Sequence, residues 1–68
     1  MKNMEWISVK IELPKMGEYV LLCTVAWIGV GKYAPDLYNP CDWQDERNEF
    51  IDNAVVTHWM PLPEQPTV

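Results

Sequence analysis

The chain has 68 residues and a net charge of −5, with 10 acidic residues against 5 lysines and arginines. A chain this short forms one domain that buries only about 60% of its unfolded surface, so it needs an efficient core or a partner. The acidic balance argues against nucleic-acid binding, which draws its affinity from clustered cations. The longest uncharged run, residues 19–31, is shorter than the about 20 residues that cross a bilayer, so it predicts core and no membrane contact.

The predicted elements begin with a short strand at residues 6–9. Pro14 and Gly17 then indicate a loop or a single helical turn over residues 10–18. The strongest strand pattern is at residues 19–25, where both faces are largely apolar. That pattern is typical of a strand that is covered on both sides.

Residues 27–33 form the next predicted strand. Because strand side chains alternate, one face carries Trp27 and Tyr33 with two glycines between them. The glycines leave a notch that another backbone, an aromatic ring or a flat ligand can approach closely. In the simplest interpretation a tryptophan of the same chain fills this notch: Trp6, Trp43 or Trp59.

Polar residues and chain breakers dominate residues 35–48, for which we expect an exposed loop with at most one or two helical turns after Pro40. The remaining elements are a strand at 49–51, a turn at 52–53, a strand at 55–60 and a loose tail at 64–68. The sequence therefore predicts a single, mainly β domain over residues 1–68, with a small α+β fold as the alternative. Three or four strands form an antiparallel meander with at most one or two short helical turns. So few residues cover only one face of such a sheet, so we expect a homo-oligomer.

His58 is the only histidine, the residue type most often used for acid–base catalysis. In the last strand it alternates with Trp59, which places the two on opposite faces and favours His58 as a hydrogen-bonded packing residue. A Cys–His dyad would need an oxyanion hole, and zinc would need four ligands at paired spacings. Cys23, Cys41 and His58 are isolated in the sequence, so we predict no enzyme, no metal site and no cofactor.

Aromatic and cationic side chains are the candidates for a ligand site, because rings stack on flat ligands and cations pair with phosphates. The predicted ligand-binding residues are Trp6, Trp27, Lys32, Tyr33, Trp43, Arg47, His58 and Trp59. A second candidate surface is acidic and holds one arginine, which is typical of a solvated face or of a surface for a cationic partner. Its residues are Asp42, Asp45, Glu46, Glu49 and Asp52.

The two ends of the chain together resemble a known family. The segments WISV at residues 6–9, LP at 13–14 and VTHWMPLP at 56–63 are similar to those of short phage and prophage proteins grouped as domain of unknown function 551. The resemblance implies a phage or prophage source and the host bacterial cytoplasm as the location, and it implies no activity. The first residues lack the apolar stretch of an export signal, so both cysteines are expected to be free thiols.

Small accessory phage proteins often bind host components, including components of antiviral defence. The leading hypothesis is therefore a non-enzymatic counter-defence protein that sequesters a nucleotide-like immune signal in aromatic pockets of a homo-oligomer. In the alternative hypothesis, the acidic surface binds a host defence protein directly. A purely structural accessory domain and a small hydrolase that uses His58 are the remaining alternatives.

Overall fold

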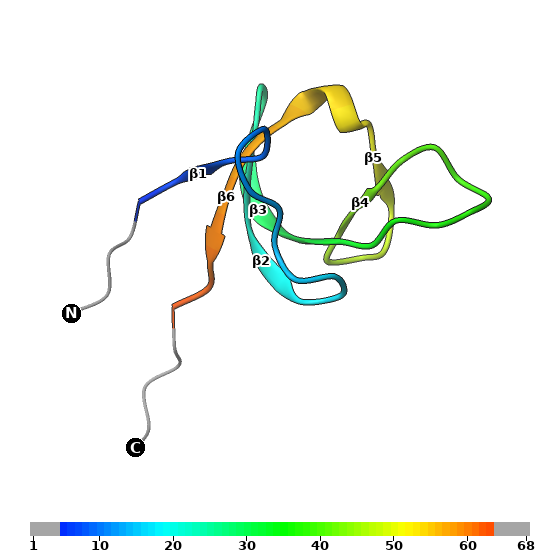
Figure 1. The fold of residues 1–68 in the computed structure, drawn as a ribbon, viewed down its shortest axis with the longest axis horizontal. Helices are drawn as coiled ribbons and strands as arrows, with labels where there is room; N and C mark the ends of the chain where they lie inside the picture. The colour runs from blue at the N-terminus through cyan, green and yellow to red at the C-terminus, as the bar shows by residue number, and fades with distance from the viewer. Residues whose placement is uncertain (1–4, 64–68) are drawn as a thin grey trace, which may run out of the picture.

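A computed structural model, which describes residues 5–63, shows one antiparallel sheet and a single 3₁₀ turn within that range (Figure 1). The strands are β1 (Ile7–Ser8), β2 (Tyr19–Thr24), β3 (Ile28–Tyr33), β4 (Trp43–Asp45), β5 (Phe50–Ile51) and β6 (Val56–Pro61), and the 3₁₀ turn is η1 (Asn53–Val55). The prediction of a mainly β, antiparallel fold is confirmed. The predicted loose tail at residues 64–68 lies outside the described residues.

The strands follow the order β1-β6-β2-β3-β4-β5 in the sheet. Consecutive strands from β2 to β5 form a meander, whereas β6 returns to lie between β1 and β2. The sheet therefore has six strands where three or four were expected. The main addition is β4, in a segment that was expected to be a loop, because Trp43 packs against Tyr33 with their ring centroids 5.0 Å apart.

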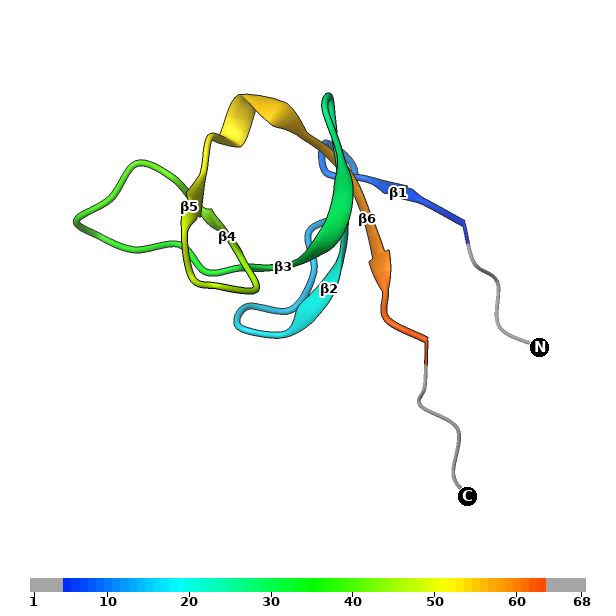
Figure 2. The same cartoon turned by 180° about the vertical axis from the view of Figure 1, so that it is seen from behind.

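The sheet curls, so that β4 and β5 face β2, β3 and β6 across the core (Figures 1 and 2). Its inner face supplies the buried side chains Val20, Leu22, Trp43, Ile51, Val56 and Trp59. Buried apolar side chains of this size contribute roughly 1.5–3 kcal/mol each. The curl therefore lets a single sheet enclose a core without a second layer.

The two faces of β2 differ in how deeply they are buried. Val20, Leu22 and Thr24 point into the core and are buried, whereas Leu21 and Cys23 point to the opposite face and are only half-buried. The expectation that this strand is covered on both sides is therefore met on the inner face only, within the residues that the structure describes.

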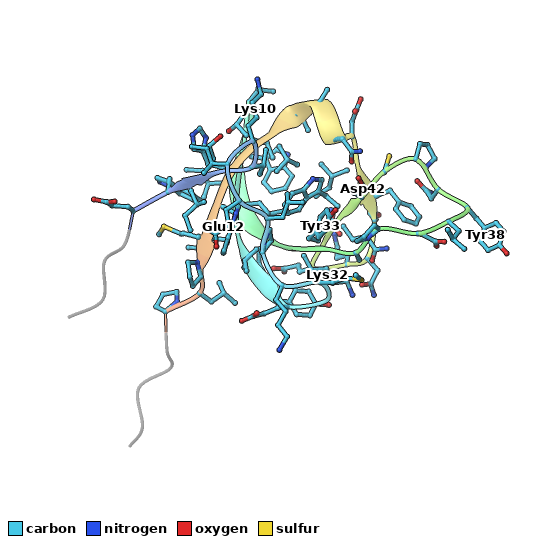
Figure 3. All side chains as sticks on the ribbon, in the orientation of Figure 1. Lys10, Glu12, Lys32, Tyr33, Tyr38 and Asp42 are labelled. Carbon is cyan, nitrogen blue, oxygen red and sulfur yellow. The ribbon has the colours of Figure 1, made fainter. Side chains whose placement is uncertain are left out.

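The segment between β3 and β4 forms a protruding loop, with Tyr38 near its tip (Figure 3). Its base is fixed by Asn53, whose Oδ1 accepts a hydrogen bond from the Asp42 N–H at 2.7 Å and whose Nδ2 donates to the Pro40 carbonyl at 3.1 Å. Cys23 and Cys41 are both free thiols. Over residues 5–63 there is no helix with the length and apolar character needed to cross a bilayer.

Candidate functional site

A groove of about 760 Å³ lies between the β2–β3 turn and the β4–β5 turn. It is lined by Trp27, Gly29, Val30, Asp45, Glu46, Arg47, Glu49, Phe50, Ile51 and Asp52. The groove exists because β4 pairs with β3 only from Gly31 to Tyr33, although β2 pairs with β3 from Ile28 onward. The first half of β3 therefore borders the groove with an edge that no described strand pairs.

Trp27 forms one wall of the groove and is held there by the tight turn that precedes it. The buried hydroxyl of Thr24 accepts hydrogen bonds from the Ala26 N–H at 3.1 Å and the Trp27 N–H at 2.9 Å, and it donates to the Trp27 carbonyl at 3.0 Å. The indole lies over Gly29, where a Cβ would meet the ring at 3.1 Å. The ring thus packs on Gly29 on one side, while 41% of Trp27 stays exposed to a ligand.

The structure also shows what fills the notch that was predicted between Trp27 and Tyr33. Leu22 of the neighbouring strand occupies the space over Gly31, together with the main-chain carbonyl of Gln44. The ring of Trp27 itself covers Gly29. The same chain does fill the notch, but the interpretation that Trp6, Trp43 or Trp59 fills it is wrong, because cross-strand and local neighbours reach the glycines first.

Asp45 holds the β4–β5 turn that forms the opposite wall. Its Oδ1 accepts hydrogen bonds from the Arg47 N–H at 2.8 Å and the Glu49 N–H at 2.9 Å, and Asn48 completes the turn with a left-handed φ of 67°. The bond from the Glu49 N–H, helped by those from Arg47, lowers the pKa of Asp45 below its ordinary value of 3.8. This carboxylate is therefore ionised wherever the protein is near neutral pH.

The groove carries an excess of negative charge. Arg47 is its cation and lies 3.6 Å from Asp45 Oδ2 and 3.8 Å from Glu49 Oε1. The Asp52 carboxylate also has a partner within the chain, because its Oδ1 accepts a hydrogen bond from the Ala54 N–H at the start of η1. Within residues 5–63, the Glu46 side chain forms no hydrogen bond or ion pair, and the Glu49 side chain forms only the long pair with Arg47. These two carboxylates are the ones that remain available to a ligand.

Most of the acidic candidate surface comes together in this groove. Asp45, Glu46, Glu49 and Asp52 all line it. The remaining member, Asp42, lies at the base of the protruding loop, where its Oδ2 accepts a hydrogen bond from Asn53 Nδ2 at 3.2 Å. Its role in the structure is to fix that loop.

The predicted ligand-binding residues do not form one site. The structure brings Trp27 and Arg47 into the groove. The others are dispersed: Trp6 precedes β1, Tyr33, Trp43 and Trp59 belong to the core or pack against it, and Lys32 and His58 point to the outer face of the sheet. Sequence reasoning missed Phe50 and Ile51 as groove residues, since only the register of β4 against β5 places them there.

His58 and Trp59 lie on opposite faces, as their alternation in β6 predicts. The Nδ1 of His58 is 3.0 Å from the Thr57 hydroxyl. Cys23 is opposite His58 in the β2–β6 register, but its thiol donates to the Thr24 carbonyl at 3.9 Å. Across the described part of the chain, no three histidine, cysteine, aspartate or glutamate side chains gather as a metal-binding group.

These features define a small single-sheet β protein with an acidic groove that has an aromatic wall. The chain belongs to the family described as Protein of unknown function (DUF551), which it matches over residues 5–67. It is similar to the "Uncharacterized 7.8 kDa protein in ral-gp17 intergenic region" of Salmonella phage P22, with 37% identity over 68 residues that cover 94% of this chain and 98% of the relative. No solved structure matches the chain. The resemblance seen at the two ends of the sequence is thereby confirmed, and the chain is a member of a phage protein family.

Proposed function

We propose that this protein is a non-enzymatic accessory binding protein whose groove holds an extended, cationic segment of a host protein. The observation that supports this proposal is the convergence of four groove carboxylates and Trp27 on the part of the β3 edge that no described strand pairs. A host protein of antiviral defence is the target class that membership in a phage family suggests, and binding would inhibit it.

The groove chemistry suits lysine and arginine side chains. Glu46 and Glu49 would form charge-assisted hydrogen bonds with them. A cation over the exposed face of Trp27 would gain about 0.5–2 kcal/mol from the ring. The main chain of the bound segment would extend the sheet along β3 between Ile28 and Val30, since an open strand edge offers unpaired amide and carbonyl groups.

Sequestration of a nucleotide-like signal receives less support from this geometry. Its phosphates would face the groove carboxylates, and Arg47 is already shared between Asp45 and Glu49. Trp43 and Trp59, which were expected to stack on a base, are buried in the core. A cationic protein segment is therefore the ligand that the site favours.

The proposal is tested by affinity purification of the tagged protein from host cells at increasing salt concentrations. The wild-type protein is expected to retain a partner at low salt and to release it at high salt, because exposed charge pairs are screened. Glu46→Lys combined with Glu49→Lys is expected to abolish the recovery. The control is Glu5→Lys combined with Glu18→Lys, which makes the same charge change at exposed residues outside the groove.

Equal recovery of the same proteins by the groove variant and the wild type would disprove the groove as the binding site. Nucleotide binding is measured separately by thermal denaturation with cyclic dinucleotides. A ligand at 100 times its dissociation constant stabilises a protein by about 2.7 kcal/mol. Stabilisation of that size would favour sequestration over protein binding.

A further inference from the structure

The outer face of the sheet is apolar, no segment within residues 5–63 covers it, and the strand register assembles it. Leu21 is opposite Met60 on one side and Val30 on the other, and Cys23 is opposite Ile28. Ile28 is 64% exposed, and the other four side chains are half-buried. We call these five residues the outer apolar face. They span the three longest strands, β2, β3 and β6.

The outer face also differs in charge from the rest of the molecule. Alternation along the strands directs outward the side chains of Ser8, Tyr19, Leu21, Cys23, Ile28, Val30, Lys32, Gln44, Phe50, His58 and Met60. This set contains Lys32 and no carboxylate. The chain as a whole carries a net charge of −5, so two copies repel each other over most of their surfaces. The outer apolar face is where a second copy can approach with the least repulsion.

We infer that the outer apolar face is the interface of a homodimer. Two sheets would pack face to face, which completes a two-layer architecture and removes from water the side of β2 that its own chain leaves open. The groove shares Val30 with this face, but none of the groove carboxylates belongs to it, so the dimer can form whether or not the groove binds a host protein.

The size of the face determines how strong the dimer is. Three neighbouring strands of six residues cover about 20 Å by 14 Å, given a rise of about 3.3 Å per residue and a spacing of about 4.8 Å between strands. A stable interface buries roughly 800 Å² on each partner, which is considerably more than the area of this face. We therefore expect a reversible dimer that dissociates on dilution.

Sedimentation velocity of the full chain over a range of concentrations tests this interface. The wild-type protein is expected to shift from monomer to dimer as its concentration rises. Leu21→Glu places a charge at the centre of the face and is expected to raise the dimer dissociation constant at least tenfold. Ile11→Glu is the control, because it makes the same change at a loop residue that is 85% exposed. Circular dichroism establishes that both variants are folded.

The two free thiols give a second measurement that needs no substitution. Alkylation of Cys23 by N-ethylmaleimide is expected to slow as the protein concentration rises, since the second copy covers it. Alkylation of Cys41, in the loop before β4, is expected to stay constant. The inference is overturned if the wild-type protein is monomeric at every concentration, if Leu21→Glu leaves the dimer intact, or if dimerisation leaves the Cys23 rate unchanged.

Discussion

The indole Nε1 of Trp59 donates a hydrogen bond to the main-chain carbonyl of Glu12 at 2.9 Å, across a separation of 47 residues. Trp59 is buried in the core, so this bond fixes the loop before β2 onto the inner face of β6. One side chain therefore contributes both apolar burial and a long-range polar link.

Trp59→Phe is expected to lower the free energy of unfolding by about 1–2 kcal/mol, because the ring is largely retained but the Glu12 carbonyl loses its donor. Trp59→Ala also leaves a cavity and is expected to cost about 3–5 kcal/mol. Urea denaturation measures both. Trp6→Phe, at an exposed site, is the control and is expected to change stability by less than about 0.5 kcal/mol. A Trp59→Phe variant as stable as the wild type would show that the bond contributes nothing.

Gly31→Ala is expected to destabilise the protein by about 1–3 kcal/mol. The added Cβ would overlap Leu22 and lie 2.6 Å from the main-chain carbonyl of Gln44, which cannot move without disturbing the β3–β4 pairing. Gly29→Ala is the comparison, since its nearest neighbour is the partly exposed ring of Trp27 and a ring can shift. The melting temperature of Gly31→Ala, measured by thermal denaturation, should therefore lie well below that of Gly29→Ala. The reverse order would contradict the packing of Leu22 over β3.

Thr24→Val is expected to cost about 1–3 kcal/mol, because it leaves the N–H groups of Ala26 and Trp27 without their acceptor. Hydrogen exchange at these two amides is expected to accelerate in the variant. Thr24→Ser retains the hydroxyl and is expected to preserve slow exchange. If Thr24→Val also weakens partner binding while Thr24→Ser does not, the hydroxyl positions Trp27 for the ligand. Equal exchange in both variants would mean that the turn forms without the hydroxyl.

The lowered pKa of Asp45 predicts that the free energy of unfolding depends on pH. Its pKa in the folded protein is lowered below the ordinary value of 3.8, so folding favours the ionised carboxylate. The stabilisation is complete above the unfolded pKa and is lost as the pH falls through the lower folded value. Asp45→Asn is therefore expected to be less stable than the wild type at pH 7 and equally stable in strong acid.

Urea denaturation at several pH values measures this difference. The control is Glu46→Gln, which removes a carboxylate from the same turn that accepts no hydrogen bond within residues 5–63. It is expected to leave stability at pH 7 unchanged or slightly higher, because it reduces repulsion in the groove. A constant difference between Asp45→Asn and the wild type at all pH values would rule out the carboxylate charge as the cause.

Local patterns were sufficient to predict the parts of the fold that depend on neighbours in sequence. The apolar run at residues 19–25 predicted β2 as a strand, and alternation in β6 separated His58 from Trp59. Prolines and glycines marked the loops for the same reason, since they act on the backbone locally.

The groove could not be predicted in this way, because it depends on pairing between distant segments. Only the offset between β3 and β4 leaves one edge of residues 28–30 without a described partner strand, and the polar residues around Trp43 give no sign that they form a strand. The acidic residues were recognised as a possible surface from their spacing. Their meeting with Trp27 required the turn that Thr24 holds.

The interior position of β6 also constrains when this protein can fold during its synthesis. β6 leaves the ribosome after the other strands, yet it separates β1 from β2 in the finished sheet. A nascent chain that lacks residues 56–61 cannot join these two strands or place Trp59 against Leu22. The sheet can therefore be completed only after β6 has been synthesised, through contacts between distant segments, and folding that depends on such contacts is slow.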